Sequence, residues 1–117
     1  MRSSCPFCRS NSLLDVPVLA ETEGAYLIRA RFSPGNYLII PSVHAESPAE
    51  LPDTWWQAVK ELLPRVPNLG EQYNLSLNIG RDAGQTVKHL HFWVVPRASG
   101  QPASGKGLAG LISEVNK

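Results

Sequence analysis

The sequence lacks the features that mark membrane proteins, secreted precursors and nucleic-acid-binding proteins. Nowhere do about 18 apolar residues stand together, as a membrane-spanning helix requires, and residues 1–6 lack the apolar stretch of a signal peptide. There is also no large excess of charge of one sign, because the chain has 11 Lys and Arg and 10 Asp and Glu, for a net charge of +1. Without a basic stripe, no nucleic-acid partner is expected. We therefore expect a cytoplasmic protein that binds no membrane and that holds any small anionic ligand with individually placed donors.

Cysteine is scarce as well, since the chain has only Cys5 and Cys8, spaced as C-x-x-C. In a reducing compartment this spacing indicates half of a metal site or a redox pair rather than a structural disulfide. A redox pair of the thioredoxin type stands at the start of a helix, which lowers the pKa of its thiol. The residues after Cys8, Arg-Ser-Asn-Ser, do not begin such a helix. The metal interpretation is therefore favoured.

Alternating apolar residues predict three strands in the first third of the chain. A short strand is expected around Val16–Ala20, and two runs rich in Tyr, Leu and Ile follow at Ala25–Phe32 and Asn36–Pro41. The segment Ser33-Pro34-Gly35-Asn36 joins the two runs, with Pro second and Gly third as a type II turn prefers. The pattern predicts a β-hairpin.

The period of the apolar residues then changes to that of a helix. A stripe of large apolar side chains recurs at i, i+4, i+7 and i+11, which faces a core: Trp55, Val59, Leu62 and Val66. The helix begins either near Ser47, where a capping box is possible, or near Asp53. Pro64 should end or kink it, because the residue before a proline avoids the helical region.

Two further strands are expected after the helix. Tyr73–Ile79 alternates apolar and polar residues, and Val87–Val95 alternates so that His89 and His91 share one face. The loop between them, Gly80–Thr86, is too short for a crossover helix. The two strands should therefore be antiparallel neighbours.

The 117 residues have the length of one domain with one core, so 1–117 is expected to be a single domain. Residues 98–107 are rich in Gly, Ser, Ala and Pro and predict a flexible segment. Residues 108–116 could form a short amphipathic helix. The order hairpin, helix, hairpin predicts an α+β architecture, an antiparallel sheet with a helix packed on one face.

A turn of Gly84-Gln85-Thr86 that leads into His89 and His91 resembles the signature of the histidine-triad (HIT) family. The resemblance covers roughly residues 5–97. It implies a HIT-like fold, a five-stranded antiparallel sheet with helices on one face, and a homodimer whose two sheets run together. It also implies a nucleotide hydrolase or transferase that attacks an α-phosphate with the middle histidine of the motif.

The resemblance assigns the chemistry to His91 and needs no cofactor for it. A neutral imidazole can attack through Nε2 when its Nδ1–H donates to a carbonyl. In the family, this carbonyl is the main-chain carbonyl of the first histidine, which here is His89. Attack on the α-phosphorus would give a nucleotidyl-histidine intermediate. The residues expected to bind the substrate are Asn78, Gly84, Gln85, Thr86 and Trp93.

The resemblance also gives the C-x-x-C pair its partners. Zinc-containing members use such a pair together with a histidine just after the first hairpin and the first histidine of the motif. In this chain the four ligands would be Cys5, Cys8, His44 and His89. They would form a closed Cys₂His₂ site, so the zinc would be structural.

A different metal site is also conceivable. His44, His89 and His91 could hold a catalytic zinc with a bound water. That arrangement would leave the C-x-x-C pair and the Gly84-Gln85-Thr86 turn without a role.

The chain departs from the family pattern at two positions. Trp93 stands where the third histidine is expected, and it cannot shuttle a proton. We therefore predict that polyphosphate leaving groups are preferred over amines. Ile28 stands where the family has Asp or Asn for the ribose hydroxyls, and it cannot accept their hydrogen bonds. An apolar slot for a base could still form from Tyr26, Ile28, Phe32 and Trp93.

These observations favour a hydrolase or nucleotidyl transferase that acts on a dinucleoside polyphosphate or a similar nucleotide conjugate. Its partner would be a small-molecule nucleotide. Two alternatives from other classes stay open: a non-catalytic nucleotide- or phosphate-binding module, and a zinc-stabilised interaction domain with structural histidines.

Overall fold

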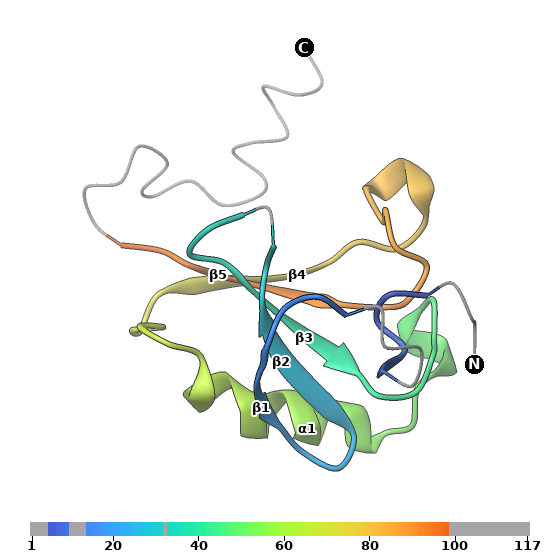
Figure 1. Ribbon diagram of the computed structural model, residues 1–117, viewed down its shortest axis with the longest axis horizontal. Helices are drawn as coiled ribbons and strands as arrows, with labels where there is room; N and C mark the ends of the chain where they lie inside the picture. The colour runs from blue at the N-terminus through green and yellow to red at the C-terminus, as the bar shows by residue number, and fades with distance from the viewer. Residues whose placement is uncertain (1–4, 10–13, 32, 99–117) are drawn as a thin grey trace.

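The computed structural model describes residues 5–9, 14–31 and 33–98 and forms an α+β fold. Five antiparallel strands make one sheet in the order β1-β2-β3-β5-β4, which confirms the predicted class (Figure 1). The strands are β1 (Val18–Glu21), β2 (Ala25–Arg29), β3 (Tyr37–Pro41), β4 (Tyr73–Leu77) and β5 (Phe92–Pro96). The helical elements that lie wholly within the described residues are α1 (Thr54–Leu62) and the short 3₁₀ helices η2 (Pro48–Glu50), η3 (Leu63–Arg65) and η4 (Arg81–Ala83).

The predicted first hairpin is confirmed as β2 and β3. The Asn36 N–H donates to Ser33 O at 3.1 Å, and Gly35 has a φ of 86°, which a type II turn requires at its third position. The strands pair with Leu27 opposite Ile39. This hairpin forms the middle of the sheet.

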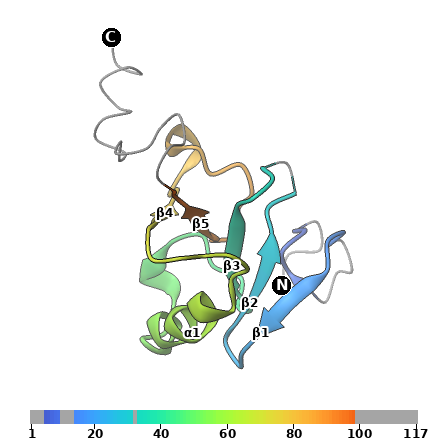
Figure 2. The ribbon, with the colours of Figure 1, turned by 90° about the vertical axis from the view of Figure 1, so that its left-hand side faces the viewer.

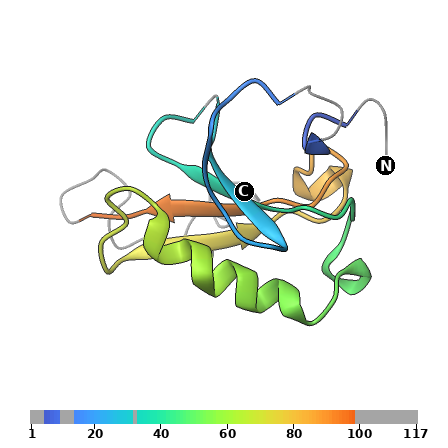
Figure 3. The ribbon, with the colours of Figure 1, turned by 60° about the horizontal axis from the view of Figure 1, so that its bottom comes forward.

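Helix α1 begins at Thr54, so the later of the two predicted starts is the one observed. It ends at Leu62, and Pro64 lies in the 3₁₀ turn that follows. The predicted stripe is buried, whereas Trp56 beside it is 50% exposed. The stripe rests on the central strands, and Figure 3 shows the helix running along one face of the sheet.

Each face of the sheet carries its own apolar cluster. Leu27, Ile39 and Val94 face the helix, while Ile28 and Leu38 face the opposite side. Segments that precede β1 cover this second face, and the residues packed there include Phe7, Leu14 and Val16. Figure 2 shows the N-terminal segment and α1 on opposite sides of β2 and β3. The alternation of the strands therefore separates a helix-covered core from the face that carries the histidines.

The last strand is shorter than predicted. β5 begins at Phe92, so His89 and His91 lie in the segment that leads into it and not within the strand. Phe92 pairs with Ile39, and continuing that register would place Leu90 opposite Pro41, which has no N–H to donate. The Leu90 N–H instead donates to Ala45 O at 2.6 Å. The chain thus joins the sheet as β5 only after the two histidines.

The predicted flexible segment 98–107 and the predicted helix 108–116 fall outside the described residues, apart from Ala98. The strand expected over Val16–Ala20 begins at Val18, directly after Pro17. Within the described ranges, no helix combines the length and the apolar character needed to cross a bilayer.

Candidate functional site

Four of the predicted ligands come together beside the end of β3. The ligand atoms of Cys5, Cys8, His44 and His89 all lie within 4.8 Å of one another. Cys8 Sγ is 3.1 Å from His44 Nδ1, and His89 Nδ1 is 3.4 Å from Cys5 Sγ and 3.5 Å from Cys8 Sγ. These residues converge from the N-terminal loop, the loop after β3 and the segment before β5.

The donor set fits a tetrahedral zinc ion. Zinc bonds of about 2.3 Å to sulfur and about 2.0–2.1 Å to nitrogen put adjacent ligand atoms about 3.5 Å apart. His89 Nε2 lies 2.8 Å from Pro41 O, so Nε2–H donates to that carbonyl and Nδ1 keeps its lone pair for a metal. Burial lowers the pKa of His89 to about 4, so its imidazole is neutral, as a ligand must be. Both cysteines are buried, and neither forms a disulfide. The cluster can therefore bind a metal as predicted.

His91 lies outside this cluster and has a different partner. Its Nδ1 is 2.8 Å from His89 O, so Nδ1–H donates to the main chain and the lone pair of Nε2 is available. Burial lowers the pKa of His91, which favours the neutral ring. The alternative of a zinc held by His44, His89 and His91 is not supported among the described residues, because the metal-binding group there pairs the two histidines with both cysteines.

A cavity of about 340 Å³ lies next to His91. Its walls are mainly apolar and include Ile28, Leu38 and Trp93 from the sheet and Phe7 from the N-terminal loop. His91 itself is only 5% exposed, yet it belongs to this lining. The arrangement can hold an apolar group with the imidazole of His91 at its edge.

The turn before the histidines uses two of its backbone amides in its own hydrogen bonds. The Gly84 N–H donates to Arg81 O and the Gln85 N–H donates to Gly80 O, so both amides are used within the turn. The Gln85 side chain is buried and bonds Gly80 N and Glu46 O, which fixes the turn to the loop after β3. Gly84 and Gln85 therefore shape the turn.

Thr86 is the residue of this turn that reaches both sides of the site. It lines the cavity beside His91 and also an adjoining polar pocket of about 390 Å³. Lys88 and Glu46 line that second pocket. Asn78 lies behind the turn, with Nδ2 3.5 Å from Gly84 O.

The predicted aromatic slot is only partly present. Trp93 and Ile28 line the cavity, and the Trp93 ring lies 6.2 Å from the His91 ring, centroid to centroid. Tyr26 instead donates its hydroxyl proton to Phe7 O at 2.5 Å. Phe32 lies outside the described residues.

Phe7 and Asp15 are among the residues of the cavity that sequence reasoning missed. The only feature of Phe7 in the sequence is its position between the two cysteines. That position indicates a metal site and does not predict a cavity. The Asp15 carboxylate lines the mouth of the cavity and pairs with Arg31 of the following hairpin. No spacing rule relates these two positions, because the pair depends on how the N-terminal segment folds over the sheet.

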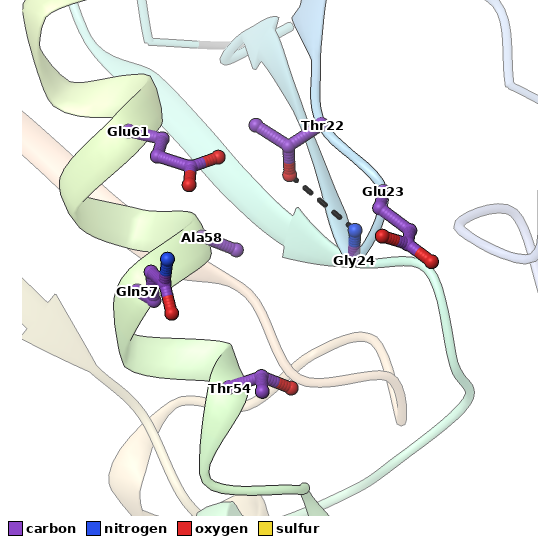
Figure 4. Close-up of a pocket in the computed structure, with 7 residues that line it drawn as sticks. All are labelled: Thr22, Glu23, Gly24, Thr54, Gln57, Ala58 and Glu61. Carbon is purple, nitrogen blue, oxygen red and sulfur yellow. Dashed lines mark hydrogen bonds between the residues drawn. The ribbon is translucent and has the colours of Figure 1, made fainter.

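A separate pocket of about 350 Å³ lies on the helix side. Figure 4 shows side chains of α1 facing the β1–β2 turn, with these residues around the space: Thr22, Glu23, Gly24, Thr54, Gln57, Ala58 and Glu61. Among these seven described residues there is no histidine, cysteine or lysine. The pocket therefore offers no imidazole, thiol or amine, whereas His91, the predicted nucleophile, lines the other cavity.

Known proteins resemble the chain in both sequence and structure. It is 36% identical over 113 residues to adenosine 5'-monophosphoramidase hnt1 of Schizosaccharomyces pombe, covering 89% of this chain and 82% of the relative. It is 35% identical over 104 residues to an uncharacterized HIT-like protein of Methanocaldococcus jannaschii, covering 82% and 81%. The crystal structure of a Zn-bound histidine triad family protein from Mycobacterium smegmatis matches with a TM-score of 0.71 at 27% identity, covering 90% and 84%.

The family model of the HIT domain matches residues 15–100, which is most of the chain. This range contains the sheet, the turn at Gly84, and both histidines of the segment before β5. The predicted resemblance is confirmed, and the chain belongs to the HIT domain family, the histidine-triad proteins.

Proposed function

We propose that the protein hydrolyses nucleotide conjugates at the α-phosphate, or passes the nucleotidyl group to another acceptor, with His91 as the nucleophile. One observation carries the proposal: His91 Nδ1 is committed to His89 O at 2.8 Å, while the ring lines a cavity. An imidazole held in this way is the correct tautomer for attack through Nε2.

The reaction takes two displacements. First, the Nε2 lone pair forms a bond to the α-phosphorus, and the bond to the leaving group breaks with its electron pair going to that group. Water then attacks the nucleotidyl-histidine, loses a proton, and the phosphorus–nitrogen bond breaks to restore neutral His91. The protein supplies mainly position and charge stabilisation.

The phosphate lies against the turn in this proposal. We assign its donors to the Thr86 hydroxyl, because Thr86 lines the cavity, and to the Asn78 amide, because Asn78 Nδ2 contacts the turn at Gly84 O. Gly84 and Gln85 contribute by holding the turn in shape, since their own amides are used within it. Trp93 contributes the wall of the cavity.

The leaving group is a polyphosphate rather than an amine. Trp93 cannot protonate a departing amine, whereas a phosphate departs as an anion. The adjoining pocket supports this choice, because Lys88 lines it and would meet a negative group. The Schizosaccharomyces pombe relative is named a monophosphoramidase, which favours an amine leaving group and makes the comparison of substrates decisive.

The test of the leaving group measures kcat/KM for a diadenosine polyphosphate and for an adenosine 5'-phosphoramidate. We expect the polyphosphate to be cleaved faster, Lys88→Ala to slow only the polyphosphate, and Trp93→His to raise the rate for the phosphoramidate. Equal or faster cleavage of the phosphoramidate by the unmodified protein would contradict the assignment.

The nucleoside occupies the apolar cavity. Ile28 offers no acceptor for ribose hydroxyls, but the Asp15 carboxylate lines the same cavity at its mouth. We assign the ribose contact to Asp15, with the base between the apolar walls.

The metal is a structural zinc. Cys5, Cys8, His44 and His89 would supply all four ligands of a tetrahedral ion, so no position would be left for a substrate. When bound, the ion would join the N-terminal loop to the segment that carries His91.

The experiment that tests the catalytic proposal incubates the protein with the polyphosphate, with and without His91→Ala. We expect turnover in the unmodified protein, a loss of at least about 1,000-fold in the variant, and a covalent nucleotidyl adduct on His91 by mass spectrometry. Turnover that survives in His91→Ala would refute the nucleophile. Binding of AMP without turnover in either form would favour the alternative, a non-catalytic nucleotide-binding module.

We also propose a homodimer that forms at the β4 edge of the sheet. β4 ends the strand order in the described sheet, and its residues Tyr73 and Leu75 are each 37% exposed. A second copy that pairs with this strand would bury both side chains and continue the sheet.

A further inference from the structure

The outer wall of the catalytic cavity comes from the segment before β1. Pro6, Phe7 and Leu14 line the cavity opposite the sheet residues. All three precede residue 15, where the match to the HIT domain model begins. This wall therefore lies outside the matched range, in the segment that also carries the two cysteines.

Phe7 is the part of this wall that contacts the histidines. Its ring centroid lies 5.1 Å from that of His91 at an interplanar angle of 72°, and 6.0 Å from that of His89 at 89°. Both are edge-to-face arrangements, which aromatic rings prefer. Phe7 thus contacts the ring of His91, the proposed nucleophile, and the ring of His89, which belongs to the metal-binding cluster.

The position of Phe7 is fixed on both sides. It stands between Cys5 and Cys8, whose sulfurs belong to the metal-binding cluster. Its carbonyl accepts a hydrogen bond from the hydroxyl of Tyr26, a fully buried residue of β2. The loop that closes the metal site therefore also holds an aromatic ring against His91.

We propose that Phe7 is a positioning residue for His91, and that the metal site controls the nucleophile through it. The inference rests on the proposed function. One hydrogen bond, from Nδ1 to His89 O, restrains the His91 ring at a single atom, so coupled changes of its side-chain torsions χ1 and χ2 can still tilt the ring. In this proposal the Phe7 ring blocks that tilt and keeps Nε2 directed into the cavity, where small displacements cost about 100-fold in rate.

The first test needs no substrate and uses the zinc-loaded protein. Diethyl pyrocarbonate acylates accessible neutral imidazole nitrogens, and peptide mass spectrometry measures its rate of reaction at His91. The variants are Phe7→Ala, Phe7→Leu, and Leu14→Ala as a matched control that enlarges the same cavity without removing the Phe7 contact. Zinc content is measured for each.

We expect Phe7→Ala to raise the labelling rate of His91 several-fold, Phe7→Leu to give an intermediate rate, and Leu14→Ala to leave it near that of the unmodified protein, with zinc retained throughout. An unchanged rate in Phe7→Ala with zinc retained, or an equal rise in Leu14→Ala, would overturn the proposal. If Phe7→Ala loses its zinc, the Phe7→Leu variant decides between these outcomes.

The second test separates positioning from binding in the turnover of the polyphosphate. Phe7→Ala should lower kcat by about 10- to 100-fold with little change in KM, whereas Leu14→Ala should mainly raise KM. A rise in KM alone for Phe7→Ala would make it a binding residue and refute the positioning role. Absence of turnover in the unmodified protein would defeat the proposed function, and the labelling result would still decide the role of Phe7.

Discussion

Gly84→Ala should disturb the proposed phosphate site in a way that can be calculated from the turn. Gly84 has a φ of 96°, a region that costs a residue with a side chain about 1–2 kcal/mol. A Cβ at this position would lie 3.3 Å from Asn78 Nδ2, so the amide would have to move by a few tenths of an ångström. Gly84→Ala therefore has two effects: it strains the backbone, and it displaces the Asn78 amide, a proposed phosphate donor.

Gly70→Ala is the matched control for this variant. Gly70 also has a positive φ, 69°, but a Cβ there would meet nothing within 4 Å. Both variants should lower the melting temperature of the zinc-loaded protein, by about 3–10 °C. Only Gly84→Ala should also raise KM for the nucleotide conjugate, by about tenfold, because a hydrogen bond to a charged phosphate is weakened.

The two assays are thermal unfolding by circular dichroism and steady-state hydrolysis. A KM for Gly84→Ala that equals that of Gly70→Ala would refute the placement of Asn78 at the phosphate. A melting temperature for Gly84→Ala that matches the unmodified protein would refute the strain argument.

Three further results are expected. Leu75→Asp should convert the dimer to a monomer by light scattering, because it buries a charge at the β4 edge; a dimer that persists would exclude this edge. Asp15→Asn should raise KM several-fold for the ribonucleotide conjugate but not for its 2'-deoxy counterpart, and equal effects on both would remove Asp15 from the ribose contact. Cys8→Ser should lower zinc affinity by at least about 100-fold, since loss of outer partners alone costs about 10- to 100-fold; metal analysis after dialysis would show an unchanged zinc content if Cys8 were not a ligand.

Local patterns predicted most of the fold because neighbouring residues decide them. The turn at Ser33-Pro34-Gly35-Asn36 and the stripe that includes Trp55 and Leu62 each have their cause within a few positions of sequence. The end of the helix at Leu62 likewise follows from Pro64 two residues later.

The start of β5 could not be predicted from the same kind of pattern. The alternation of His89, His91 and Trp93 continues without a break, so periodicity gives no sign that pairing begins at Phe92. The cause is Pro41, which lies about fifty positions earlier and would stand opposite Leu90 in the register. The end of the pairing can be recognised only when the register of β3 and β5 is known.

The turn at Gly84 shows the same limit at the level of single atoms. The resemblance assigned substrate binding to this segment, but it could not say that the amides of Gly84 and Gln85 bond within the turn. Nor could it say that the Gln85 side chain reaches Glu46 O in a loop about forty residues earlier. Residue identity therefore predicts a site in this segment, whereas the hydrogen bonds of each donor follow only from the tertiary structure.

His89 explains why the metal site and the proposed catalytic site cannot be separated in this chain. Its Nδ1 faces the two sulfurs, its Nε2–H donates to Pro41 O, and its main-chain carbonyl accepts from His91. The interactions of Nδ1 and Nε2 fix the His89 ring and hence the backbone to which it is attached. The hydrogen bond to the His89 carbonyl then orients the His91 ring relative to that backbone. A closed metal site that took no part in the proposed chemistry would therefore still set the geometry of His91, because His89 would belong to both sites.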